Sequence, residues 1–429
     1  MYENRNRLFV ASCVALVTTS MVFSIRGDIL DALGADFQLT KEQIGIILSP
    51  AFWGFTVSIL VGGSLVDWFG MRRLLFLSSF GYIAAVVAIL FAPTPDGPVE
   101  AFYADPGCLI LYGAMLTLGL AQGLVEGVIN PLCTTLYPDD KTHRMNVLHA
   151  WWPGGLIIGG LAAYVITKIM GLDSANVSAQ TTTLGWQIKL SLILIAAVIY
   201  AYLIRGQAFP ATERVTAGVS TKQMLREAIR PMFLLWWVAM WMTAATELGP
   251  NQWVASLITN LTGMSGILIL VYTAGIMFVL RFYGGPMAHR FSPMGVLTIS
   301  SILAGLGLVG LSYVETPGQA FVAATVFGVG TTYFWPFMLG VTSERFPNGG
   351  AFLLAIIGAT GMLSVAFILP MMGGWYDAEG AAAAFRHVSY FPLILIFIFG
   401  GLWLYFKSIG GYRAVNLGED TKSSHNSGS

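Results

Sequence analysis

Charge is the scarcest property of this sequence. Its 429 residues include only 22 basic and 22 acidic side chains, which together make up 10% of the chain. A soluble domain carries roughly 25% charged residues, so this chain lacks the polar surface of a cytosolic enzyme. The formal net charge of zero also argues against binding to nucleic acid or another polyanion. The composition therefore excludes the water-soluble classes, and no nucleic-acid partner is expected.

Residues that hold metals or form disulfides are also few. The three cysteines, Cys13, Cys108 and Cys133, form no CxxC pair, and no two of the five histidines have metal-ligand spacing. The sequence contains no phosphate-binding glycine loop and no nucleophile–base constellation. We therefore expect no enzyme activity, no cofactor, no metal and no use of ATP as the energy source.

Hydrophobic residues, in contrast, are abundant and lie in long runs. They make up 56% of the chain, and a membrane-spanning helix needs about 20 such residues. The runs predict an all-α polytopic membrane protein whose twelve transmembrane helices are divided six and six by a polar interruption at 206–230. The predicted spans are 8–30, 43–66, 74–92, 108–136, 146–168, 186–205, 231–258, 264–284, 294–313, 319–343, 350–374 and 388–408.

The distribution of basic residues predicts the orientation. With both termini on one side, the opposite side receives only four basic residues, Lys41, Lys168, Lys189 and Arg386. Because basic loops remain in the cytoplasm, we expect cytoplasmic termini in a plasma (inner) membrane. We expect an N-terminal bundle at 1–205, a cytoplasmic loop at 206–230, a C-terminal bundle at 231–410 and a polar tail at 411–429. The outward loops hold two glycosylation sequons, at Asn176 and Asn260.

A glycine-rich motif occurs at the same point of each six-span unit. The second copy is degraded and has His289 in place of the acid, and the first copy reads Gly63-x-x-x-Asp67-x-x-Gly70-x-Arg72-Arg73. This motif resembles the cytoplasmic signature loop of the major facilitator superfamily. The resemblance implies a major facilitator fold, with two pseudo-symmetric six-helix bundles that rock around a central cavity. It also implies that these five residues gate the transporter and do not bind its substrate.

Ionisable groups within the spans are functional candidates because they are costly at membrane depth. In the fourth span, Gln122, Glu126 and Asn130 recur every four residues and share one helix face. A carboxylate and two amides suit a solute rich in hydroxyl groups. The alternative is a hydrogen-bond network between helices that binds no ligand.

The neighbouring spans add three further candidates. Asn146 and His149 share a face of the fifth span, where the histidine either contacts substrate, relays protons or is simply packed. Asp28 lies near the outer end of the first span, where a carboxyl in apolar surroundings can take up and release a proton. Arg26 is about 200° from Asp28 around the helix, so we expect the two not to pair. The alternative is that Asp28 is an ordinary outer-loop acid exposed to water.

The second half offers four candidate residues. Glu247 and Asn251 are spaced i, i+4 in the seventh span, and Gln252 follows them. Gly249-Pro250 predicts a broken helix, and broken helices at mid-depth often line binding sites. Trp335 in the tenth span can stack on a sugar ring, although tryptophan in membrane proteins often serves packing instead.

The first half also resembles the fucose permease branch of the superfamily. The resemblance rests on Glu126-x-x-x-Asn130-Pro131, Asn146-x-x-His149 and Asp28-Ile29-Leu30. It implies that Glu126 contacts a sugar and that Asp28 couples transport to protons, with Glu126 as a second coupling candidate. The chain departs from the branch at Gly27, where the branch has asparagine, at His149, where it has glutamine, and at Arg26.

We therefore predict a secondary transporter of a small polar solute, most simply a monosaccharide, with H⁺ as the coupling ion. The expected partners are this solute, the ion and the lipid bilayer, and the expected state is a monomer. One alternative is another cargo, such as an organic acid, a peptide or a drug. Only Arg26 is set against three intramembrane acids, which disfavours anions. Na⁺ coupling, uniport and a non-transporting receptor or scaffold are the remaining alternatives.

Overall fold

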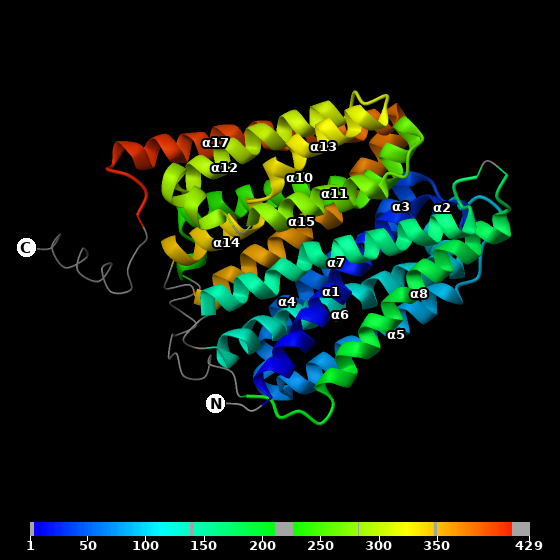
Figure 1. The fold of residues 1–429 in the computed structure, drawn as a ribbon, viewed down its shortest axis with the longest axis horizontal. Helices are drawn as coiled ribbons and strands as arrows, with labels where there is room; N and C mark the ends of the chain where they lie inside the picture. The colour runs from blue at the N-terminus through cyan, green and yellow to red at the C-terminus, as the bar shows by residue number, and fades with distance from the viewer. Residues whose placement is uncertain are drawn as a thin grey trace, which may run out of the picture.

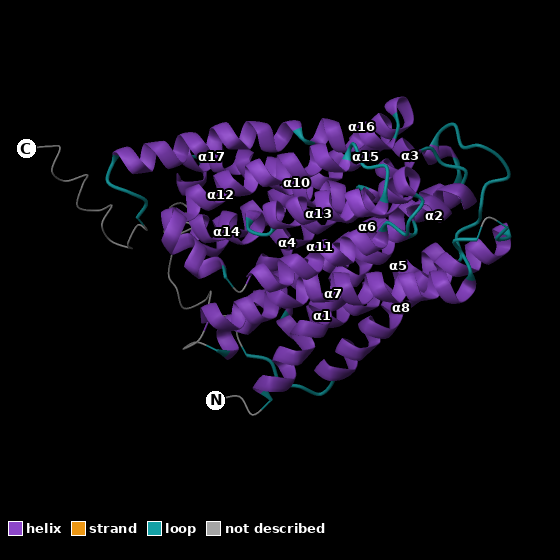
Figure 2. Ribbon diagram, turned by 45° about the horizontal axis from the view of Figure 1, so that its top comes forward, coloured by secondary structure: helices purple, strands orange, loops and turns teal. Residues whose placement is uncertain are grey.

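The computed structural model describes residues 4–137, 141–174, 176–210, 226–281, 283–346 and 350–413. Within these ranges the chain forms sixteen α-helices and one short 3-10 helix, η1 (Phe102–Ala104), and Figure 2 shows no strand among them. The predicted all-α fold is thus confirmed. Most of the predicted central loop (211–225) and tail (414–429) lies outside the described residues.

Each predicted span of the first half corresponds to one helix or to two consecutive helices. A short helix, α2 (Leu30–Asp36), follows the first span, and the second span is divided into two helices. The first-half spans are α1 (Arg5–Asp28), α3 (Lys41–Leu48) with α4 (Pro50–Phe69), α5 (Met71–Leu90), α6 (Pro106–Leu136), α7 (Lys141–Met170) and α8 (Ala179–Ile204).

The second half repeats the pattern, with its tenth and twelfth spans divided. Its helices are α10 (Pro231–Thr262), α11 (Ile267–Arg281), α12 (Gly284–Leu311), α13 (Pro317–Thr331) with α14 (Phe334–Arg345), α15 (Gly350–Glu379) and α16 (Ala381–Val388) with α17 (Tyr390–Ser408). Ten of the twelve spans are long and apolar enough to cross a membrane. The other two are α11, which has 15 residues, and α10, whose middle carries polar side chains.

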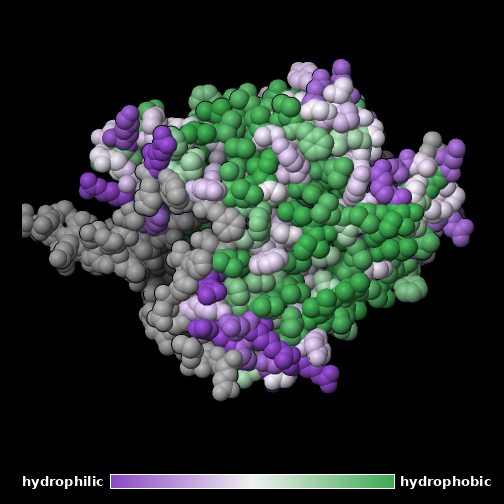
Figure 3. Space-filling model, viewed as in Figure 1, coloured by the Kyte–Doolittle hydropathy of each residue, from purple (hydrophilic) through white to green (hydrophobic). Residues whose placement is uncertain are grey.

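The helices form two bundles that lie side by side (Figure 1). In the first bundle α1 packs on α7 and α8, and α6 packs on α4 and α5; in the second, α12 packs on α13 and α17. Contacts between the bundles run from α1 to α10, from α3 and α4 to α15, and from α7 to α11. Hydrophobic residues cover the middle of the visible face and hydrophilic residues gather toward its ends (Figure 3), as a membrane-embedded surface requires.

The predicted break of the seventh span is wrong, because α10 continues through Gly249 and Pro250 without interruption. A proline removes one backbone donor, and neighbouring helices in a membrane protein can accommodate that loss. Gly249 packs closely on α15, since a Cβ built there would lie 2.9 Å from Cγ2 of Ile368. The tenth span, in contrast, is divided at Thr332 and Tyr333.

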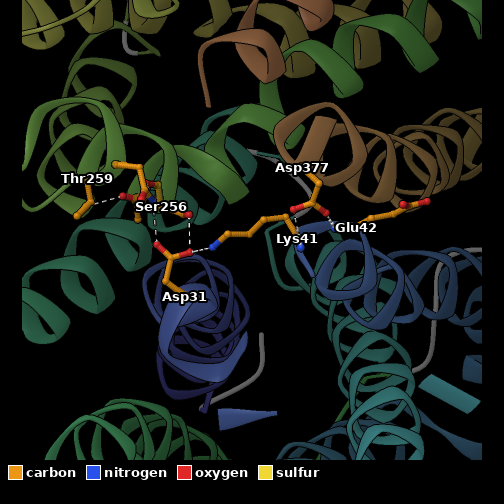
Figure 4. A network of polar contacts seen from close by, with 8 residues as sticks. Asp31, Lys41, Glu42, Ser256, Thr259 and Asp377 are labelled. Carbon is orange, nitrogen blue, oxygen red and sulfur yellow. Dashed lines mark hydrogen bonds and ion pairs between the residues drawn. The ribbon is translucent and has the colours of Figure 1, made fainter. Parts of the chain in front are cut away.

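The two bundles are tied together at the end of the molecule opposite the termini (Figures 1 and 4). Asp31 of α2 accepts hydrogen bonds from Ser256 Oγ (2.7 Å) and Asn260 Nδ2 (3.3 Å) of α10, and it pairs with Lys41. Asp377 of α15 accepts from the first backbone amides of α3, those of Lys41 (3.2 Å) and Glu42 (2.8 Å). We call Asp31, Lys41, Ser256, Asn260 and Asp377 the latch.

Glycines allow the helix backbones to meet beneath the latch. A Cβ built on Gly45 of α3 would lie 2.5 Å from Cα of Pro370, and one on Gly373 of α15 would lie 2.2 Å from the carbonyl oxygen of Lys41. Real Cβ contacts are never so short, so any larger residue would push α3 and α15 apart. The bundles are therefore closed against each other at the latched end.

Candidate functional site

The polar face predicted on the fourth span exists on α6. Asn130 Nδ2 donates to Glu126 Oε2 (3.2 Å), and its Oδ1 lies 3.0 Å from His149 Nε2 of α7. Because the amide oxygen can only accept, His149 donates through Nε2. Glu126 is only 9% exposed, and it has no cation among these contacts. The structure thus brings three predicted site residues into one chain of hydrogen bonds, which we call the polar row.

The polar row continues toward α1 and α5. Gln122, one turn before Glu126, donates to the carbonyl oxygen of Thr19 (3.4 Å), and the hydroxyl of Thr19 lies 2.8 Å from that of Tyr82. The Tyr82 side chain is fully buried. The side chain of Asn146 lies outside the described part, so its predicted role remains a prediction.

Arg26 is held across the interface between the bundles. Its Nε donates to Gln252 Oε1 of α10 (2.7 Å), and Gln252 Nε2 donates back to the carbonyl oxygen of Phe23 (2.8 Å). The guanidinium carbon lies 4.7 Å from the ring centre of Phe52. Gln252 was predicted as a substrate contact, and in this structure it fixes an arginine.

Asp28 forms a buried ion pair. Lys189 Nζ of α8 lies 2.6 Å from Asp28 Oδ2. The side chain of Asp28 is only 9% exposed, and that of Lys189 is 8% exposed. The sequence analysis assigned Lys189 to the outward side, but it lies inside the bundle. As predicted, Asp28 does not pair with Arg26. Removing one partner of a buried pair costs about 3–5 kcal/mol, so the two residues act as a unit.

Glu247 faces a third intramembrane cation. Its Oε1 lies 3.8 Å from Arg281 NH2 of α11, and its Oε2 is buried and has no hydrogen-bond partner among the described residues. Arg281 Nε donates to the carbonyl oxygen of Thr332 (3.4 Å), where the tenth span is divided. Asn251 is buried one turn beyond Glu247.

Trp335 is engaged in packing between helices. A Cβ built on Gly361 of α15 would lie 2.6 Å from its ring, and the same point would lie 2.7 Å from Cε of Met240. These contacts place the indole between α10 and α15. Its predicted contact with cargo remains a prediction.

The signature motif lies where α4 meets α5. Gly70 has φ +79°, which only glycine adopts without strain, and it precedes the first residue of α5. Arg72 and Arg73 are exposed. The side chain of Asp67 and the surroundings of Gly63 lie outside the described part, so the gating role of the motif remains a prediction.

Two intramembrane cations escaped the sequence analysis. Lys189 is expected among the outward residues, and both Lys189 and Arg281 stand close to the edge of a hydrophobic run. The signal that could have found Lys189 is its place ten residues inside a continuous helix, which begins at Ala179. Among the described residues, no group of three or more His, Cys, Asp or Glu side chains could hold a metal ion.

Polytopic helices in two similar bundles, with charged groups buried between them, define a membrane transporter of the two-bundle class. The sequence profile described as Major Facilitator Superfamily matches residues 8–367. The chain therefore belongs to the major facilitator superfamily, as predicted from its signature motif.

Solved structures share the fold over nearly the whole chain. The xylose transporter XylE of E. coli, in a partially occluded inward-open conformation, has a TM-score of 0.73 at 13% identity and covers 92% of this chain and 97% of its own. The transporter FucP, in an outward conformation, has a TM-score of 0.63 at 18% identity and covers 92% and 98%. The resemblance to the fucose permease branch is consistent with this similarity.

The names of the curated relatives give cargos other than sugars. A cis,cis-muconate transport protein of Acinetobacter baylyi is 22% identical over 398 residues, which cover 84% of this chain and 88% of the relative. A voltage-gated purine nucleotide uniporter of Rattus norvegicus is 25% identical over 206 residues. That match spans 46% of this chain and only 42% of the uniporter's length.

Proposed function

We propose that this transporter carries a monosaccharide-like solute together with protons, by alternating access between the two bundles. The polar row is the observation that carries the proposal. Glu126, Asn130 and His149 form one connected set of donors and acceptors at membrane depth. Each hydroxyl of a sugar both donates and accepts a hydrogen bond, so a sugar can replace the bonds that the row now makes with itself.

The surroundings of the two predicted coupling acids favour Glu126. Asp28 is matched by the Lys189 ammonium, so a proton added to Asp28 would leave a buried ammonium without its partner. Among the described residues Glu126 has a hydrogen bond from the neutral amide of Asn130 and no ion pair, so protonation there removes a buried charge and leaves none of the described cations unpaired. We therefore assign proton uptake to Glu126 and a supporting role to Asp28.

The proposed setting follows from the basic residues. We propose cytoplasmic termini in a plasma membrane, with 1–205 and 231–410 as the moving bundles, 206–230 as their connection and 411–429 as a tail. The latched end then faces outward. The similarity to XylE and FucP supports sugar cargo, while the muconate relative supports an organic acid.

Transport into proteoliposomes tests the proposal. Purified protein is reconstituted with an acidic exterior, and the uptake of radiolabelled pentoses and hexoses is measured with and without a protonophore. We expect at least one sugar to accumulate and the protonophore to abolish accumulation. If no sugar enters above protein-free vesicles, the cargo proposal is wrong; accumulation that ignores the protonophore contradicts proton coupling.

A further inference from the structure

The guanidinium of Arg26 is buried, and among the described residues only its Nε donates a hydrogen bond. Arg26 is 1% exposed, and neither NH1 nor NH2 has a hydrogen-bond partner among the described residues. A buried cation without a partner is strongly unfavourable unless something neutralises it. The two unpaired nitrogens therefore require an explanation.

The geometry fixes which part of the guanidinium remains available. Gln252 occupies Nε, and the rings of Phe52 and Phe23 lie 4.7 and 5.8 Å from the guanidinium carbon. Gln252 is itself held by the carbonyl oxygen of Phe23, so the group is oriented before any ligand arrives. The edge formed by NH1 and NH2 is left, and this edge offers two parallel donors to the two oxygens of a carboxylate.

The balance of charge between the bundles points the same way. Asp28 is matched by Lys189, and Glu247 faces Arg281. The sequence-based argument against anions set Arg26 alone against three acids, but two of these acids have cations of their own. Within the part of the chain that the structure describes, Arg26 forms no ion pair with an acid and Glu126 forms none with a cation.

We propose that Arg26 binds the carboxylate of the cargo, so that the transported solute is a hydroxy acid of sugar size, such as a uronate or an aldonate. This inference rests on the proposed function, since the hydroxyl groups of the same solute would bind the polar row. Thr19 and Arg26 are seven residues apart and therefore share one face of α1, and Thr19 contacts Gln122 of α6.

A neutral sugar alone would not complete this site. It would satisfy the polar row but would leave the NH1 and NH2 edge of Arg26 without an anion. A proton on Glu126 and a carboxylate on Arg26 would instead neutralise both remaining charges at once. The cargo and the coupling ion would then bind cooperatively.

Ligand-induced thermal stabilisation of the purified wild-type protein gives the first test, because a bound ligand raises stability. Two matched sets of ligands are compared, each with a sugar, its uronate and its amide. One set is glucose, glucuronate and glucuronamide, and the other is galactose, galacturonate and galacturonamide. Succinate is added as an acid that lacks hydroxyl groups. We expect at least one uronate to bind ten-fold or more tightly than its matched sugar and amide, and more tightly than succinate. A neutral sugar or amide that binds as well as its uronate overturns the inference, whatever the variants do.

Two variants give the second test. In Arg26→Gln we expect uronate binding to fall to the level of the neutral sugar, while neutral-sugar binding changes less than three-fold. Arg26→Lys keeps the charge but loses the fork, and we expect an intermediate affinity. Arg386→Gln, at an exposed arginine outside the signature motif and the proposed site, is the control. Uronate binding that is unchanged in both Arg26 variants contradicts the assignment.

The outcomes distinguish a failure of this inference from a failure of the proposed function on which it rests. If neutral sugars are transported with protons and uronates are not preferred, only the carboxylate assignment fails. If neither sugars nor uronates bind or accumulate, the proposed function itself fails. If Arg26→Gln does not fold, the comparison of each uronate with its amide on the wild-type protein still decides.

Discussion

At the scale of single residues, the site depends on which buried charges have partners. Lys189 pairs with Asp28 and Arg281 faces Glu247, whereas the one partner of Glu126 among the described residues is the amide of Asn130. An acid with neutral neighbours can change its protonation state without stranding a cation. This makes Glu126 the most informative residue to change.

For Glu126→Gln we expect loss of accumulation. Glutamine keeps the size and one acceptor of glutamate but cannot take up a proton, so coupled uptake should fall at least ten-fold. Exchange of cargo across the membrane without a gradient should persist, because that process needs no net proton movement. In the same vesicles, counterflow measures the exchange and pH-driven uptake measures the accumulation. Glu379→Gln is the control. Accumulation near wild type would contradict the assignment.

The buried pair of Asp28 and Lys189 supports a second prediction, which concerns stability. Asp28→Asn should destabilise the protein by about 3–5 kcal/mol, because it strands a buried ammonium. The double variant Asp28→Asn/Lys189→Met should recover most of that loss, since neither charge remains. Denaturation monitored by tryptophan fluorescence in detergent measures both variants.

The same pair of variants separates support from proton coupling. If the recovered double variant still accumulates cargo with wild-type pH dependence, Asp28 supports the bundle. If it is stable but its uptake no longer responds to pH, Asp28 carries the proton after all, and the assignment to Glu126 is wrong.

At the scale of helices, hydrophobic runs were enough to predict the twelve spans, because a span must hide its backbone in any membrane. Helix continuity was less predictable. Pro250 suggested a break in α10, but α10 is continuous, and the break in the tenth span precedes Trp335-Pro336. Whether a proline interrupts a helix depends on what packs beside it, which a local pattern does not contain.

The candidate site was predictable within one helix and not between helices. Gln122, Glu126 and Asn130 share a face by spacing alone, and the structure adds His149 as expected. The Arg26–Gln252 and Asp28–Lys189 contacts join residues 226 and 161 positions apart. No periodicity links such residues, so their pairing could be learned only from the packed helices.

The contact between α3 and α15 supports a prediction at this scale. Gly373→Ala should weaken closure at the latched end, because the new Cβ would meet the backbone oxygen of Lys41. Gly275→Ala in α11 is the matched control, since a Cβ there meets nothing within 4 Å and alanine favours a helix by about 1 kcal/mol. We expect slower uptake for the first variant and wild-type uptake for the second. Equal rates would show that the close contact has no role in the transport cycle.

At the scale of the whole molecule, the latch holds the two bundles in one of their arrangements. Its hydrogen bonds are mostly exposed and contribute about 0.5–1.5 kcal/mol each. In the proposed alternating-access cycle, a few such bonds are strong enough to favour one state and weak enough to break in each turn of the cycle.

Removing one latch residue should therefore shift the population of the two states. Asp377→Ala loses both hydrogen bonds to the amides of α3, and a loss of about 1.4 kcal/mol would shift the equilibrium ten-fold. Distances between spin labels on Ser174 and Glu315, one on each bundle, measure the shift in a cysteine-free background. Longer distances are expected for the variant.

Glu379→Ala is the matched control for the latch. Glu379 is an acid on the same helix, but it bonds to His387 within its own bundle (2.9 Å). In the Glu379→Ala variant, the distribution of distances between the two spin labels should stay as in the wild-type protein. Identical shifts in the two variants, or none in Asp377→Ala, would contradict a latch between the bundles.

The latch also makes the two glycosylation sequons unequal. Asn176 is an exposed turn residue between α7 and α8, whereas Asn260 lies within α10 and donates to both Asp31 and the carbonyl oxygen of Ser256. In a host that glycosylates, we expect Asn176→Gln to abolish the mobility shift of the carbohydrate and Asn260→Gln to leave it unchanged. A sugar chain attached at Asn260 would lie between the bundles and prevent them from closing at this end of the transporter.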